Sequence, residues 1–74
     1  MRKYLVIIEK SDDGFGAYSP DIPGCVAVAG TQPEVEQKMY EAIAFHLDGL
    51  KEEGLPLPSG ESVAEYVLVP EVVA

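Results

Sequence analysis

Hydrophobic and polar positions predict three short strands at the start of this chain. The stretches rich in β-branched, aromatic and small apolar residues are 3–8, 15–19 and 25–29. Between the first two, Asp13 and Gly14 are typical of a hairpin turn that needs positive φ. Between the second and third, Pro23 and Gly24 fit the central positions of a type II turn. We therefore expect an antiparallel meander of three strands.

A helical pattern follows the third strand. Thr31 is the predicted N-cap, and Glu34 stands three residues later, where it completes a capping box. Apolar and boundary residues then recur at spacings of three and four: Val35, Met39, Ala42, Ile43, His46, Leu47 and Leu50. Gly54 is a C-terminal stop signal. The pattern predicts one amphipathic helix that packs by a single face.

The remaining residues predict a fourth strand over 63–69, which Pro70 ends. Pro56 and Pro58 keep the connection before it extended. A strand-helix-strand crossover is almost always right-handed, so the last strand is expected beside the first and parallel to it. The expected fold is α+β, with order β-β-β-α-β, sheet order 3-2-1-4 and one helix on one face.

Both faces of the first and last predicted strands are apolar, although one helix covers only one face of a sheet. A homo-oligomer or another protein is expected to cover the second face. The alternative is that long side chains and the proline-rich connection cover it.

Length and charge limit the function classes. The 74 residues are expected to form one domain, 1–74, and the formal net charge of -8 disfavours direct binding to nucleic acid. The same charge favours a basic partner, although it is also explained by a solvated acidic surface. No segment approaches the roughly 20 apolar residues that span a membrane, and residues 1–8 read as a strand rather than a signal peptide. We expect a cytoplasmic protein.

Four acidic residues near turns are the first candidates for chemistry: Glu9, Asp12, Asp13 and Asp21. Clustered carboxylates can bind a divalent metal. These positions lack the spacing of a known ligand loop, and turns recruit Asp for local backbone hydrogen bonds. We expect no metal, no cofactor and no catalytic residue.

The single cysteine, Cys25, and the single histidine, His46, are the other candidates. Their spacing leaves a catalytic dyad open, but no orienting Asn or Asp motif accompanies them. We interpret Cys25 as a small core hydrophobe and His46 as a core or boundary residue.

Several short motifs occur together along nearly the whole chain. They are Tyr4-x-Val6-x-Ile8-Glu9, Asp13-Gly14, Tyr18-x-Pro20-Asp21-Ile22-Pro23-Gly24-Cys25, Gly30-Thr31, Glu34, Glu41-Ala42-Ile43 and Gly54-x-Pro56-x-Pro58. In combination they resemble the HicB-like antitoxin family. The resemblance implies a truncated ribonuclease-H-like fold without a working set of catalytic carboxylates.

The resemblance also implies a function. Members of this family are oligomeric and typically neutralise a HicA-type toxin, a small basic protein that cleaves messenger RNA. Many members carry a C-terminal DNA-binding segment, whereas this sequence stops at Ala74, so repressor activity is not carried over.

The leading hypothesis is therefore an antitoxin-like protein that covers a basic ribonuclease and has no chemistry of its own. The expected partner contacts are Glu9, Asp12, Asp13, Tyr18 and Asp21. The alternatives are an orphan oligomeric binding module with another protein partner and a metal-dependent, ribonuclease-H-like nuclease.

Overall fold

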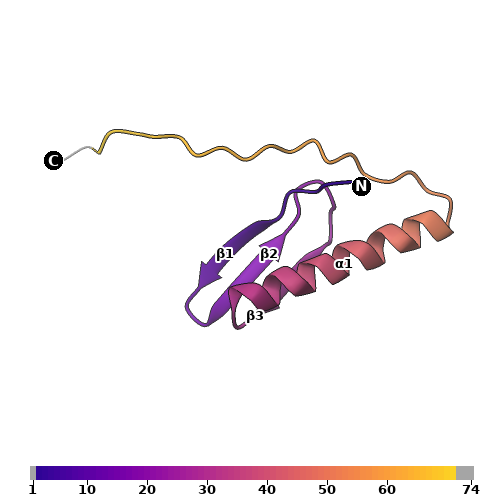
Figure 1. The fold of residues 1–74 in the computed structure, drawn as a ribbon, viewed down its shortest axis with the longest axis horizontal. Helices are drawn as coiled ribbons and strands as arrows, with labels where there is room; N and C mark the ends of the chain where they lie inside the picture. The colour runs from indigo at the N-terminus through magenta and orange to yellow at the C-terminus, as the bar shows by residue number, and fades with distance from the viewer. Residues whose placement is uncertain (1, 72–74) are drawn as a thin grey trace.

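The computed structural model describes residues 2–71, which form a three-stranded antiparallel sheet followed by one long helix (Figure 1). The elements are β1 (Ile7–Ser11), β2 (Gly14–Tyr18), β3 (Val26–Ala29) and α1 (Gln32–Glu52). The strands lie in the order β1-β2-β3, and α1 packs against β2 and β3. This arrangement confirms the α+β class and the predicted meander.

Strand register decides which residues face the helix. Ile8, Ala17 and Ala27 are aligned across the three strands, as are Ile7, Tyr18 and Val26 in the neighbouring row. Ala17 is buried, whereas Val26 keeps 67% of its surface exposed. Because successive side chains point to opposite faces, the first row faces α1 and the second row faces away from it.

The core lies between the sheet and the first half of α1. Its buried residues are Ala17, Ile22, Cys25, Val35 and Met39. Ile22 comes from the loop between β2 and β3 and is fully buried together with Val35 and Met39. The interpretation of Cys25 as a small core residue is confirmed.

Local signals set both ends of α1. The Glu34 amide donates to Thr31 Oγ1 at 3.3 Å, and the Thr31 hydroxyl donates to Glu34 Oε1 at 2.9 Å, so the predicted capping residues are confirmed. At the other end Gly54 has φ +71, and the Leu55 amide donates to the Leu50 carbonyl at 2.9 Å. This bond and the positive φ of Gly54 are typical of a Schellman motif, in which glycine accepts the left-handed conformation without steric cost.

The turn between β2 and β3 agrees with the predicted type II geometry. The Cys25 amide donates to the Ile22 carbonyl at 3.2 Å, and Gly24 has φ +86. The hairpin turn between β1 and β2 differs from the prediction. Gly14 pairs with Ser11 inside the ladder, and within residues 2–71 only Gly24 and Gly54 have positive φ. The prediction of positive φ at residues 13–14 is therefore wrong.

The first strand begins later than predicted. We expected it over residues 3–8, but β1 starts at Ile7, because Ile7 pairs with Tyr18 and β2 ends there. Residues before Ile7 run past the end of β2. They lie instead beside residues 60–64, and residues of the two segments 3–5 and 60–64 line a common hollow.

The predicted fourth strand differs most from the structure. Residues 63–69, named the arm, are extended but pair with no strand within the described chain, and every arm residue is exposed. The sheet therefore has the order 3-2-1, and no strand of residues 2–71 lies along β1 in the fourth position. Extended conformation follows from local β propensity, whereas strand pairing also needs an adjacent edge.

Among residues 2–71, no helix is both long and apolar enough to cross a bilayer.

Candidate functional site

The five predicted partner contacts do not form one cluster. Asp12 and Asp13 form the β1–β2 hairpin turn at one end of the sheet, and Glu9 lies in the middle of β1, opposite Gly16; all three are exposed. Tyr18 and Asp21 lie at the other end, where β2 leads into the loop before β3. The five strand residues between the two ends span about 15 Å. The structure therefore does not bring the predicted contacts together in one site.

Asp21 has a structural role. Its Oδ1 accepts a hydrogen bond from the Ser62 hydroxyl at 2.7 Å, and its Oδ2 accepts one from the Ser62 amide at 3.1 Å. Nearby, the Tyr4 hydroxyl donates to the Pro58 carbonyl at 2.8 Å. These bonds hold the chain after α1 against the loop between β2 and β3 and against the N-terminal segment, so the Asp21 carboxylate is already engaged within its own chain.

Glu9 and Asp13 border an open depression, named the hairpin hollow, of about 770 Å³. Its lining residues are Glu9, Lys10, Ser11, Asp13, Gly14, Phe15, Gly16, Val28 and Ala29. Gly14 and Gly16 have no side chains to cover the backbone, while Glu9 and Asp13 contribute carboxylates to the lining. The hollow thus combines exposed backbone, an apolar wall and negative charge, which suits contact with a basic protein surface.

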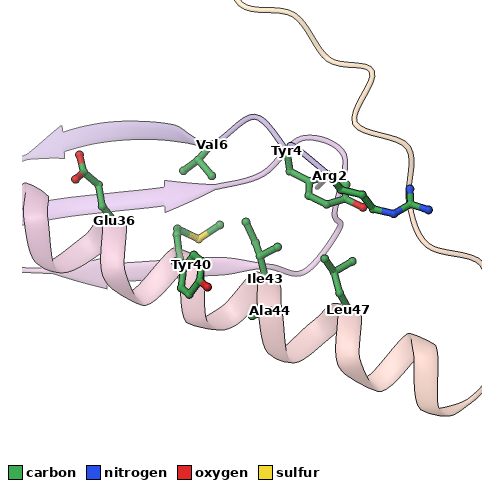
Figure 2. A pocket seen from close by; sticks show the side chains of 9 residues that line it. Arg2, Tyr4, Val6, Glu36, Tyr40, Ile43, Ala44 and Leu47 are labelled. Carbon is green, nitrogen blue, oxygen red and sulfur yellow. The ribbon is translucent and has the colours of Figure 1, made fainter.

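A second hollow, named the edge groove, lies between the N-terminal segment and α1 (Figure 2). It has a volume of about 340 Å³ and is lined by Arg2, Tyr4, Val6, Glu36, Met39, Tyr40, Ile43, Ala44 and Leu47. Figure 2 shows that the Val6 side chain points from the N-terminal segment toward α1. The Ile43 and Leu47 side chains point from α1 toward the N-terminal segment. The groove is mostly apolar and lies between α1 and the N-terminal segment that leads into β1.

The edge groove was missed by the sequence reasoning. Tyr40 and Ala44 lie outside the apolar stripe predicted for the helix, and Tyr40 keeps 70% of its surface exposed. The sequence does contain a sign of this groove, because Glu36, Tyr40 and Leu47 form a second row of residues at helical spacing. The second row indicates that the contact face of the helix is broader than one sheet can cover.

The candidates for chemistry remain separate. Among residues 2–71 no group of three or more His, Cys, Asp or Glu side chains lies close enough to hold a metal ion. Burial raises the pKa of the Cys25 thiol, whose Sγ lies 3.9 Å from the Ala42 carbonyl oxygen. The thiol therefore stays protonated near neutral pH and is a poor nucleophile. His46 is half-buried on α1, in agreement with a boundary residue.

Two further surfaces are apolar and uncovered. On the sheet face opposite α1, Val26 and Val28 are 67% and 74% exposed. In the arm, Tyr66 and Leu68 are fully exposed or nearly so, and Val67 and Val69 are also open. Exposed apolar surface of this extent typically marks a contact surface.

These surfaces define the class of the molecule: a small α+β domain whose distinctive features are contact surfaces. Residues 4–73 match the family of HicB-like antitoxins of bacterial toxin–antitoxin systems. The chain belongs to this family.

Two other proteins are similar to this chain in sequence. The chain is 37% identical over 68 residues to a 14.9 kDa protein from the rep-hol intergenic region of Haemophilus phage HP1, covering 92% of this chain and 51% of the phage protein. A UPF0150 protein of Thermoplasma acidophilum is 35% identical over 67 residues, which cover 86% of this chain and 97% of that protein. The chain thus spans about half of the phage protein and nearly all of the archaeal one.

A solved structure is also similar. It is the complex of HicA3 and HicB3, a toxin–antitoxin pair, in which the matched chain is 41% identical to this one with a TM-score of 0.63. The match covers 76% of this chain and 65% of that chain.

Proposed function

We propose that this protein is an antitoxin that binds and inhibits a small basic HicA-type messenger-RNA-cleaving toxin in the cytoplasm, without chemistry of its own. The observation that carries the proposal is the similarity, at 41% identity, to a chain from a toxin–antitoxin complex. Family membership over residues 4–73 supports the same function.

Charge and shape support this function and favour one place for the contact. The formal net charge of -8 attracts a basic partner over long distances and speeds its association. Glu9 and Asp13 line the hairpin hollow, Asp12 lies beside Asp13 in the turn, and all three residues are exposed. Tyr18 and Asp21 are weaker candidates, because Asp21 is bonded to Ser62 and both lie at the far end of the sheet. We place the toxin contact at the hairpin end.

The experiment is an RNA-cleavage assay with a purified basic toxin, such as the product of an adjacent reading frame. A molar excess of this chain is expected to abolish cleavage. The Asp13→Lys variant is expected to weaken inhibition by roughly tenfold or more, because reversing one charge in a close interfacial pair costs at least about 1.4 kcal/mol. Asp48→Lys makes the same charge change on an exposed helix position and is the matched control.

Two results would count against the proposal. Full cleavage in the presence of excess chain rejects inhibition, and equal losses from Asp13→Lys and Asp48→Lys reject the hairpin end as the contact.

A second candidate is an orphan oligomeric module with another protein partner. It is favoured by the exposed apolar arm and by Val26 and Val28 on the open sheet face. Stable self-association without affinity for any ribonuclease would distinguish it. A metal-dependent, ribonuclease-H-like nuclease would instead cleave RNA with magnesium or manganese and lose that activity in a Glu9→Gln variant.

A further inference from the structure

The arm is apolar on both sides. Tyr66 and Leu68 alternate with Val67 and Val69, and no charged residue stands between Glu65 and Glu71. In a strand these two pairs point to opposite faces. All four side chains are at least 73% exposed. Exposed apolar surface of this extent is typical of a segment that is covered by a partner on both of its faces.

The start of the arm is held in place. The Ser62 bonds to Asp21 fix it to the loop between β2 and β3, and the bond between the Tyr4 hydroxyl and the Pro58 carbonyl holds the preceding residues beside the N-terminal segment. Gly60 approaches so closely that a Cβ there would collide with the Lys3 carbonyl oxygen. From this fixed point the arm leaves its own sheet, and Figure 1 shows it running beyond the strands.

The same chain carries a surface that such a strand would complete. β1 is an edge strand whose free side faces no other strand of the described chain, and the edge groove lies next to it, between α1 and the N-terminal segment that leads into β1. A strand added along the free side of β1 would direct one row of side chains toward the groove. Its other row would extend the uncovered sheet face that carries Val26 and Val28.

We infer that the arm of each copy crosses to a second copy of this chain and adds a fourth strand to the free edge of that copy's β1, with one apolar row in its edge groove. A second copy is the indicated occupant, because each chain offers one donor arm and one acceptor edge. In a reciprocal exchange about a two-fold axis, each arm pairs with the β1 edge of the other copy, so no arm and no edge stays unpaired. The uncharged stretch between Glu65 and Glu71 lets two acidic chains approach there.

In such a dimer the sheet would have the predicted order 3-2-1-4, with the fourth strand supplied by the other copy. This inference gives a structural form to self-association and does not depend on binding of a ribonuclease, so its tests use this chain alone.

The first test is the molar mass of the purified chain in solution, measured by sedimentation equilibrium over a wide range of concentration. Twice the 8.0 kDa mass of one chain is expected. Leu68→Asp in the arm and Tyr40→Asp in the groove are each expected to raise the dissociation constant at least tenfold. Both residues are exposed in the single copy, so the fold should persist. Phe45→Asp is the matched control, since Phe45 is 82% exposed on the same helix but does not line the groove.

The second test locates the arm. A spin label is attached at Glu65→Cys in a Cys25→Ala background, and this copy is mixed with an isotope-labelled copy that carries no spin label. Broadening of the isotope-labelled amides along Ile7–Ser11 is expected, because only contact between copies produces it.

Three results would overturn the inference. They are a monomeric natural chain at every concentration, a Leu68→Asp variant that dimerises as tightly as the natural chain, and broadening of Ile7–Ser11 only when the spin label and the isotope are on the same chain. The last result would mean that the arm folds back onto its own β1.

Discussion

The body of the molecule, residues 7–52, and the arm are built from the same kinds of residues but differ in burial. Ile22, Val35 and Met39 are fully buried between the sheet and α1, whereas Leu68 keeps 98% of its surface exposed. The difference does not come from local conformation, since both regions contain the extended or helical structure that their sequences favour. It comes from the presence or absence of a second layer. Apolar patterning therefore identifies surfaces that need a partner, and the partner can lie outside the chain.

The largest expected effect tests the difference in burial between the body and the arm directly. Ile22→Ala and Leu68→Ala remove the same number of carbon atoms from a buried and an exposed site. Ile22→Ala should lower the free energy of unfolding by about 2–5 kcal/mol, because it removes buried surface and leaves a cavity. Leu68→Ala should change it by less than about 0.5 kcal/mol in dilute, monomeric protein. Urea denaturation monitored by circular dichroism measures both, and equal losses would mean that the arm is buried in the single copy.

A smaller effect concerns the junction between the two regions. Asp21→Ala removes both hydrogen bonds that fix Ser62. Hydrogen bonds to a charged group contribute about 1.5–3 kcal/mol, so exchange of the Ser62 amide with solvent should become about 10- to 150-fold faster. Asp12→Ala, in the exposed hairpin turn, is the control. Unchanged exchange in Asp21→Ala would show that other contacts hold the start of the arm.

The smallest effect lies within the body and sharpens the contrast with the arm. Thr31→Ala removes the side chain that caps α1 and should lower the free energy of unfolding by about 1 kcal/mol. Thr31→Ser keeps the hydroxyl and should lose much less. Thermal unfolding followed at the helix signal compares the two variants. Equal losses would assign the effect to the Thr31 methyl group instead of the cap.

The candidate site could be predicted only in part. The acidic hairpin end was predicted because Asp and Glu near a turn are exposed by the turn itself, and Glu9, Asp12 and Asp13 are exposed as expected. The role of Asp21 was not predictable, since its partner Ser62 lies 41 residues away. The edge groove was missed for the same reason: the N-terminal segment and α1 form it together, and no single stretch contains its outline.

By itself the sequence determined the three-stranded meander and the helix after it, the cap at Thr31, the stop at Gly54 and the type II turn at Pro23 and Gly24. Each of these depends on interactions between residues only a few positions apart. Tertiary structure alone decided that β1 begins at Ile7, that the candidate contacts do not form one cluster, and that the arm pairs with no strand of the described residues. Those features depend on which distant segments pack along an edge or against a face of the sheet, and the local pattern of residues contains no information about that.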